Sequence, residues 1–158
     1  MKILAVSAVI VCFDQITKTL IKNSLNLFDS VPIIENFFHF TFIKNSGMAF
    51  GLNFPGGIYF FTTASLILTC ILFWMLWRER NSSIYIRLAF ALIIGGAIGN
   101  LIDRILYGEV VDFLDFMIGD YHWYVFNLAD TSVSIGMGIL LIQTLFFSPK
   151  PPNMESLR

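Results

Sequence analysis

Two aspartates in separate parts of the sequence are the strongest candidates for chemistry. Asp112 lies in the segment VVDF, and Asp130 ends the segment FNLAD, where a long apolar run begins. Two carboxyl groups held close together cannot both ionise easily, so they share one proton. The ionised carboxylate can then take a proton from water while the protonated one polarises a carbonyl group. A pair of this kind would hydrolyse a peptide bond without a metal ion or a covalent intermediate.

The sequence lacks the motifs of two other classes of hydrolytic enzyme. It contains no GxSxG segment for a serine hydrolase and no HExxH segment for a zinc protease. His39 and His122 are both flanked by aromatic residues, which is typical of residues at a membrane interface. We therefore expect no metal ion and no cofactor. Asp130 also has a purely structural interpretation, because an acidic residue in the first turn of a helix is favoured by the helix dipole.

The composition indicates that these acids belong to an integral membrane protein. Of the 158 residues, 56% are hydrophobic and 13% are charged, and the mean hydropathy is +0.74. Soluble domains contain roughly 45–50% apolar and about 25% charged residues. The net charge of -1 argues against nucleic acid as a partner.

Four segments are long and apolar enough to cross a bilayer, which takes roughly 20 residues. The predicted spans are Ile3–Ile21, Ile58–Trp77, Ile86–Leu106 and Val125–Phe147. The first resembles a signal peptide, but polar residues and no small-residue cleavage site follow it, so we interpret it as a retained helix.

Basic residues predict the orientation of these spans. They precede the first span, bracket the loop between the second and third, and follow the fourth, as Lys2, Arg78, Arg80, Arg87, Lys150 and Arg158. We therefore expect both termini in the cytoplasm and the two longer connections, about 22–57 and about 107–124, on the outer face. Residues 1–148 would form one membrane domain, and residues 149–158, which are rich in proline, a flexible cytoplasmic tail.

The two outer connections carry different patterns. Aromatic and β-branched residues cluster and partly alternate in Phe37–Gly51, which predicts a short sheet against the membrane surface. In Glu109–Asp120, acids are mixed with apolar residues, which favours an amphipathic helix at the interface. The predicted fold class is therefore a membrane all-α protein: a bundle of four transmembrane helices with a small β element and an interfacial helix.

Further polar residues lie within the predicted spans, where charges are costly and often functional. Asp14 and Lys18 are four residues apart and can form a structural ion pair. Near the end of the third span, Asp103 and Arg104 can anchor the helix at the interface. Asn100 lies one turn deeper, where a buried hydrogen bond would be the simplest explanation. Gly95 and Gly99 are spaced to let a neighbouring helix approach closely.

The distribution of these residues distinguishes between three functional hypotheses. The polar side chains all map to the outer half of the molecule: Asp14, Asn45, Asn100, Asp103, Arg104, Asp112, Asn127 and Asp130. A proton-coupled transporter using Asp14, Asp103 and Asp130 as relays would be expected to carry its site near the bilayer midplane. A non-catalytic scaffold would use the same residues only to hold helices together. The one-sided distribution favours an active site open to one surface.

Five segments, taken in order, resemble the bacterial lipoprotein signal peptidases, also called signal peptidase II. They are DQITK (Asp14–Lys18), NSGMAFG (Asn45–Gly51), GNLIDR (Gly99–Arg104), VVDF (Val110–Phe113) and FNLAD (Phe126–Asp130). The resemblance implies an aspartyl endopeptidase of the inner membrane. Such an enzyme removes the signal peptide from a prolipoprotein, just before the cysteine that carries a diacylglyceryl group.

The same resemblance implies roles for individual residues. Asp112 and Asp130 match the catalytic pair of the family. Positions around the pair, the substrate or the antibiotic globomycin are matched by Asn45, Gly47, Asn100, Arg104 and Asn127, and supporting positions by Asp14, Lys18 and Asp103. The expected partners are a lipid-modified prolipoprotein and membrane lipid, with the enzyme working as a monomer.

Overall fold

The structure, a computed structural model, describes residues 2–46, 57–119 and 121–147. Four helices in these ranges are long and apolar enough to cross a membrane. They are α1 (Leu4–Ser24), α2 (Gly57–Arg78), α3 (Ile84–Tyr107) and α4 (Leu128–Phe146). The four predicted spans are therefore confirmed, with ends that differ by up to three residues. The predicted tail, residues 149–158, lies outside the described residues.

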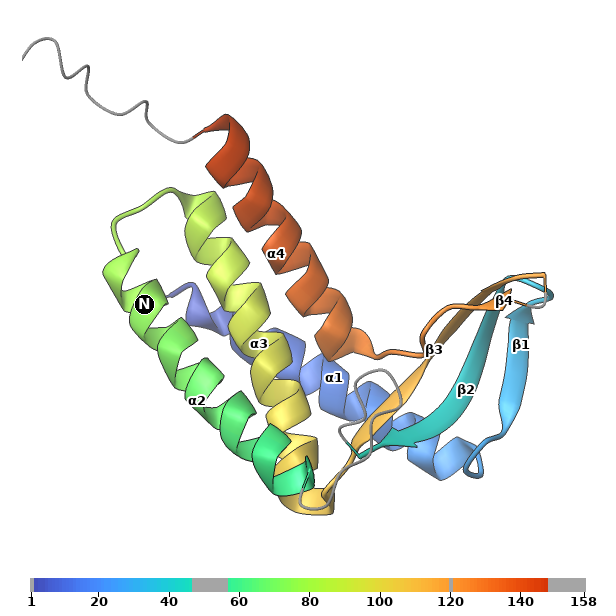
Figure 1. Cartoon of the computed structure of the whole chain (residues 1–158). Helices are drawn as coiled ribbons and strands as arrows, with labels where there is room; N and C mark the ends of the chain where they lie inside the picture. Colours follow the sequence, from blue (N-terminus) through green and yellow to red (C-terminus); the bar gives the residue numbers. More distant parts are fainter. Residues whose placement is uncertain (1, 47–56, 120, 148–158) are drawn as a thin grey trace, which may run out of the picture.

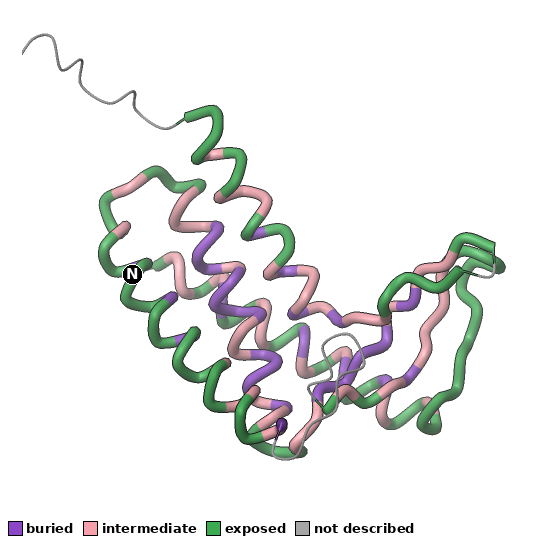
Figure 2. Tube along the Cα trace, in the orientation of Figure 1, coloured by how far each residue is buried: buried purple, intermediate pink, exposed green. Residues whose placement is uncertain are grey.

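Helix α3 is the centre of the bundle and contacts the other three helices. Half of its most apolar stretch is buried, whereas the other three helices bury only 11–17% of theirs. Figure 2 shows this difference as a buried path along α3 between mostly exposed helices. The apolar outer faces of α1, α2 and α4 are therefore the surfaces available to lipid.

Small residues allow the close contacts of α3. A Cβ atom added to Gly99 would lie 2.6 Å from the Oδ2 atom of Asp14, and one added to Gly95 would lie 2.9 Å from Cβ of Ile10, both on α1. The opposite neighbour, α4, approaches equally closely at Gly96, where an added Cβ would lie 2.3 Å from the carbonyl oxygen of Ala129. The predicted small-residue contact of the third span is thus present, and α3 uses such contacts on two sides.

The remaining elements form a four-stranded antiparallel sheet in the order β1-β2-β3-β4. Its strands are β1 (Ser30–Ile34), β2 (Phe38–Asn45), β3 (Val110–Ile118) and β4 (Tyr121–His122). The short sheet predicted for Phe37–Gly51 is confirmed for β2, and residues 47–51 lie outside the described ranges. Strands β2 and β3 join the two long connections between the helices, with Ile43 opposite Asp112 and Asn45 opposite Val110.

The interfacial helix predicted between the third and fourth spans is wrong. Residues Val110–Ile118 form strand β3 instead. Acids and apolar residues are mixed here because both faces of the strand are buried near its start. The residues at most 4% exposed there are Val110, Val111, Asp112 and Phe113. Sequence periodicity cannot reveal the partner strand β2, whose hydrogen bonds decide between the two conformations.

The sheet extends from one end of the helix bundle (Figure 1). The end of α3 and the beginning of α4 lie at the same end, while the N-terminal end of α1 and the turn between α2 and α3 lie at the other. Gly108, with a φ of 76°, ends α3 and allows the chain to turn directly into β3. The base of the sheet is held by an apolar cluster of Ile21, Phe42, Val111 and Phe113.

Candidate active site

A buried ion cluster lies between α1 and α3, at the end of the bundle that carries the sheet. The Nζ atom of Lys18 is 2.9 Å from the Oδ2 atom of Asp14 and 3.0 Å from the Oδ2 atom of Asp103. All three side chains are at most 1% exposed. One ammonium group therefore neutralises two carboxylates only in part, and the other carboxylate lone pairs need hydrogen-bond donors.

Those donors come from three different elements. The backbone N–H of Ala129, in the first turn of α4, donates to Asp14 at 3.0 Å. The backbone N–H of Val111 in β3 donates to Asp103 at 3.2 Å. The side-chain amide of Gln15 donates to both carboxylates. The cluster thus ties α1, α3, β3 and α4 together, and it fixes the start of the two segments that carry Asp112 and Asp130.

Asn100 connects the ion cluster to the acids above it. Its Oδ1 atom accepts hydrogen bonds from Lys18 at 2.9 Å and from the Nδ2 atom of Asn127 at 3.1 Å. Its own Nδ2 atom donates to the Oδ1 atom of Asp130 at 2.7 Å. Because the carbonyl end of this amide faces two donors, its amino end must point at the carboxylate, and the orientation of Asn100 is fixed.

Asn127 links the two aspartates through a single side chain. Its Nδ2 atom donates to the Oδ1 atom of Asp112 at 2.7 Å, and its Oδ1 atom accepts from the backbone N–H of Asp130 at 3.0 Å. Asn127 is the N-cap of α4, and the Oδ2 atom of Asp130 accepts in return from the backbone N–H of Asn127 at 3.3 Å. This reciprocal capping box begins α4 at Leu128 and places Asp130 next to Asp112.

Burial and charge act together on Asp112. Its side chain is 2% exposed, and its second oxygen, Oδ2, accepts a hydrogen bond from Asn45 on β2 at 3.1 Å. Burial and the nearby Asp130 carboxylate raise the pKa of Asp112 to about 7, against the opposing effect of the hydrogen bonds from Asn45 and Asn127. Asp112 therefore keeps its proton up to about pH 7, where an ordinary aspartate is fully ionised.

Arg104, in the last turn of α3, is a cation near the two aspartates. Its Nη1 atom donates to the carbonyl oxygen of Asn100 at 3.5 Å, and it lies within electrostatic reach of Asp130 and Asp112. Its Nε atom is buried without a hydrogen-bond partner among the described residues. The guanidinium therefore has donors to offer to a bound carbonyl or acidic group.

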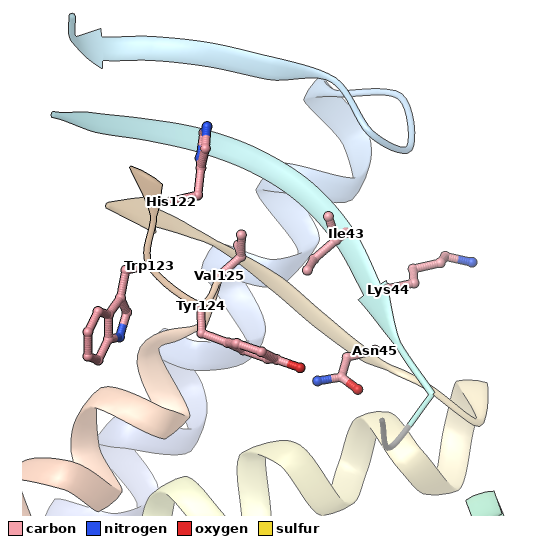
Figure 3. Close-up of a pocket in the computed structure, with 7 residues that line it drawn as sticks. All are labelled: Ile43, Lys44, Asn45, His122, Trp123, Tyr124 and Val125. Carbon is pink, nitrogen blue, oxygen red and sulfur yellow. The ribbon is translucent and has the colours of Figure 1, made fainter. Parts of the chain in front are cut away.

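A groove opens beside Asn45. Its volume is about 340 Å³, and its lining comes from the end of β2, from β4 and from the segment after β4: Ile43, Lys44, Asn45, His122, Trp123, Tyr124 and Val125. Figure 3 shows the Tyr124 ring extending across the groove toward the Asn45 side chain, while Lys44 points away from it. Asn45 belongs both to the groove and to the surroundings of Asp112, so a ligand in the groove would lie next to the acidic pair.

The structure brings the sequence-predicted site residues into one connected cluster. It joins Asp14, Lys18, Asn45, Asn100, Asp103, Arg104, Asp112, Asn127 and Asp130 through the contacts described above. Gly47, the remaining one, lies outside the described residues. Sequence reasoning missed Gln15, although it belongs to the segment DQITK. It directly follows Asp14, and adjacent residues on a helix are not expected to lie on the same face.

A second buried acid on β3 was also missed. Asp115 is 2% exposed and accepts a hydrogen bond from Thr41 at 2.7 Å, while the Nδ1 atom of His122 lies 3.0 Å from it. Because side chains alternate along a strand, Asp115 points to the opposite face of β3 from Asp112. It therefore joins β2 to β4 across the sheet and stays apart from the acidic pair.

Four membrane-spanning helices that converge on a buried set of carboxylates and amides define a multi-pass membrane protein with an acidic site at one end of its bundle. The sequence profile of the family described as Signal peptidase (SPase) II matches residues 6–146. The chain therefore belongs to the signal peptidase II family, and it is a peptidase.

Individual relatives agree over most of the chain. A lipoprotein signal peptidase of Syntrophotalea carbinolica is 40% identical over 142 residues, which cover 89% of this chain and 88% of the relative. A lipoprotein signal peptidase of Bacillus pumilus is 40% identical over 145 residues, with 92% and 93% covered. A solved bacterial membrane enzyme is similar with a TM-score of 0.81 and 32% identity, covering 96% of this chain and 94% of that one.

Proposed function

We propose that this protein is an aspartic endopeptidase that removes the signal peptide from diacylglyceryl-modified prolipoproteins. The cleaved bond is the one just before the lipidated cysteine. One observation carries the proposal: a single amide, that of Asn127, contacts Asp112 through its nitrogen and the backbone of Asp130 through its oxygen. Two acids from separate elements are thereby held at one point, at the end of a membrane-spanning bundle.

The chemistry follows from the different surroundings of the two acids. Asp112 holds a proton up to about pH 7 because its pKa is raised to about that value. Asp130 acts as the general base and takes a proton from a water molecule held between the two carboxyl groups. The protonated Asp112 donates a hydrogen bond to the carbonyl oxygen of the peptide bond while that water attacks the carbonyl carbon. The proton on Asp130 then passes to the leaving amine, and the bond breaks without a covalent intermediate.

The amides around the pair would have positioning roles. Asn100 donates a hydrogen bond to the Oδ1 atom of Asp130. The Oδ2 atom of Asp130 is then left for the capping bond from Asn127 and for the attacking water. The guanidinium of Arg104 would hold an oxygen of the substrate backbone, or of globomycin in its place. The groove beside Asn45 would receive the peptide, because Asn45 both lines it and donates a hydrogen bond to Asp112.

The location of the cluster matches a lipid-anchored substrate. We propose that the protein is a monomer of one domain in the bacterial inner membrane, with both termini in the cytoplasm and the sheet on the outer face. A substrate anchored by its diacylglyceryl group would then present its cleavage site at the depth of Asp130, in the first turn of α4. The relay alternative is disfavoured, because Asp14 and Asp103 are occupied by Lys18 and by backbone donors.

The test is cleavage of a diacylated prolipoprotein peptide by the purified full chain in detergent. We expect Asp112→Asn and Asp130→Asn each to abolish cleavage. The matched control is Asp29→Asn, which makes the same change at an exposed turn carboxylate whose hydrogen bonds are with Asn26. Cleavage at an unchanged rate by a folded Asp112→Asn or Asp130→Asn protein would refute the two-aspartate mechanism, whereas cleavage by neither the variants nor the wild type would refute the substrate assignment.

A further inference from the structure

A second cavity lies at the opposite end of the bundle from the acidic cluster. Its volume is about 400 Å³, and it is lined by Lys2, Ile3, Val6, Arg80, Ile84 and Arg87. These residues come from the start of α1, the turn after α2 and the start of α3, which lie together at the end of the bundle away from the sheet (Figure 1). The volume falls within the range of roughly 300–1,000 Å³ that is common for small-molecule sites.

The cavity gathers positive charge without a counter-charge. Three of its six lining residues are cationic and none is acidic. In the described part of the chain, no carboxylate forms a salt bridge with Lys2, Arg80 or Arg87. The start of α3 adds to this field, because the positive end of the helix dipole lies at Ile84, just after the capping Ser83.

Arg87 has a donor that no described residue satisfies. Its Nε atom is buried and has no hydrogen-bond partner among the described residues. Buried donors are almost always paired, so an unpaired one in a cavity wall indicates an acceptor that comes from outside the chain. A guanidinium offers donors in a planar fork, which suits the oxygens of a phosphate group.

The surroundings of the cavity indicate where that acceptor comes from. Ile3, Val6 and Ile84 supply apolar walls, and they belong to or directly adjoin helices that can span a membrane. Arg80 is held at the rim of the cavity by Trp77. Its Nη1 atom donates to the carbonyl oxygen of Trp77 at 3.1 Å, and its guanidinium carbon lies over the Trp77 ring, 5.1 Å from the ring centroid. Charged walls beside apolar ones match a molecule with an anionic head and an apolar tail.

We propose that this cavity binds the phosphate headgroup of an anionic phospholipid, with Arg87 as its principal ligand and Lys2 and Arg80 at the rim. A general excess of basic residues on one side of a membrane accounts for charge at this end of the bundle. It does not account for a cavity that collects three cations from separate segments, or for the unpaired Nε atom. Basic pockets between membrane helices are recognised sites for lipid headgroups.

The test is a titration of the purified full chain in detergent with phosphatidylglycerol, with bound lipid counted by native mass spectrometry. We expect Arg87→Gln to weaken binding by about tenfold or more, as loss of a charge-assisted bidentate contact would. Arg87→Lys should recover part of the affinity, since it restores the charge but not the fork. The matched control is Arg78→Gln at the same end of the bundle, because Arg78 stacks on Trp74 and does not line the cavity.

Two further arms keep the test decisive. If Arg87→Gln does not fold, the exposed pair Lys2→Gln with Arg80→Gln should still weaken phosphatidylglycerol binding relative to Arg78→Gln. Inorganic phosphate should compete only weakly, because it lacks the apolar tail. Equal losses for Arg87→Gln and Arg78→Gln would overturn the proposal in favour of general charge attraction, and tight binding of inorganic phosphate alone would overturn the lipid as its source.

Discussion

Replacing Asp112 by asparagine should stabilise the folded protein at alkaline pH relative to acidic pH. The pKa of Asp112 is raised from 3.8 to about 7 by burial and by Asp130. Between these two pH values the folded state holds a proton that the unfolded state releases, so the stability of the wild type falls as the pH rises through this window. Asparagine is neutral at every pH, and the variant is spared this loss.

The size of the effect follows from the raised pKa. A distance of one pH unit corresponds to 1.36 kcal/mol, so the window from 3.8 to about 7 is equivalent to about 4 kcal/mol. Any pH-independent consequence of the substitution, such as a changed hydrogen bond to Asn45 or Asn127, cancels when the two pH values are compared. The stability difference between the Asp112→Asn variant and the wild type should therefore shift by about 4 kcal/mol in favour of the variant between pH 4 and pH 8.

The measurement is unfolding by a denaturing detergent at both pH values, followed through the fluorescence of the three tryptophans. Repeating the comparison in an Asp130→Asn background separates the two causes. The shift should shrink there, because the neighbouring carboxylate is gone, but it should persist, because burial is the larger cause. A stability difference that is the same at pH 4 and pH 8 would refute the raised pKa of Asp112 and the division of roles built on it.

The other predictions concern the supports of the site and its pH dependence. Because protonated Asp112 polarises the scissile carbonyl, kcat/KM for the diacylated peptide should fall as the pH rises above about 7, and a rate that keeps rising through pH 9 would contradict this. Lys18→Met leaves two buried carboxylates without their cation and should destabilise the protein by about 3–5 kcal/mol in detergent unfolding; an unchanged midpoint would contradict the buried cluster. Asp103→Asn should chiefly lower the yield of folded protein, since Asp103 binds Lys18 and the backbone of β3, and a purified variant of normal thermal stability without activity would argue against this supporting role. Gly99→Leu should disrupt packing, because an added Cβ lies 2.6 Å from a carboxylate oxygen of α1, whereas Gly138→Leu, with no atom within 4 Å, should leave detergent stability unchanged.

The helices could be predicted because their signals are local. Each membrane-spanning segment is a stretch of consecutive apolar residues. The spacing of Gly95 and Gly99 alone predicts a close helix contact. Asp130 was recognisable as a first-turn acid for the same reason, and the structure adds that Asn127 caps the helix reciprocally. The sheet was only partly predictable. The pattern of β2 was visible, but β3 was mistaken for an interfacial helix because its acids, Asp112 and Asp115, serve opposite faces of a strand.

The sequence by itself determined that this chain lies in a membrane, where its four spans run, and which polar residues are too costly to be there without a reason. Those properties depend on composition and on neighbours along the chain, which every conformation shares. Only the tertiary structure decided that Lys18 neutralises acids of two helices, that Asn127 holds Asp112 and Asp130 at one point, and that Arg87 faces a cavity at the other end. The pairs Lys18–Asp14 and Asn127–Asp130 are local, but Lys18–Asp103 and Asn127–Asp112 join separate elements, and the cavity beside Arg87 is lined by three segments. The distances between separate elements are set by the packing of whole helices and strands, which no local pattern encodes.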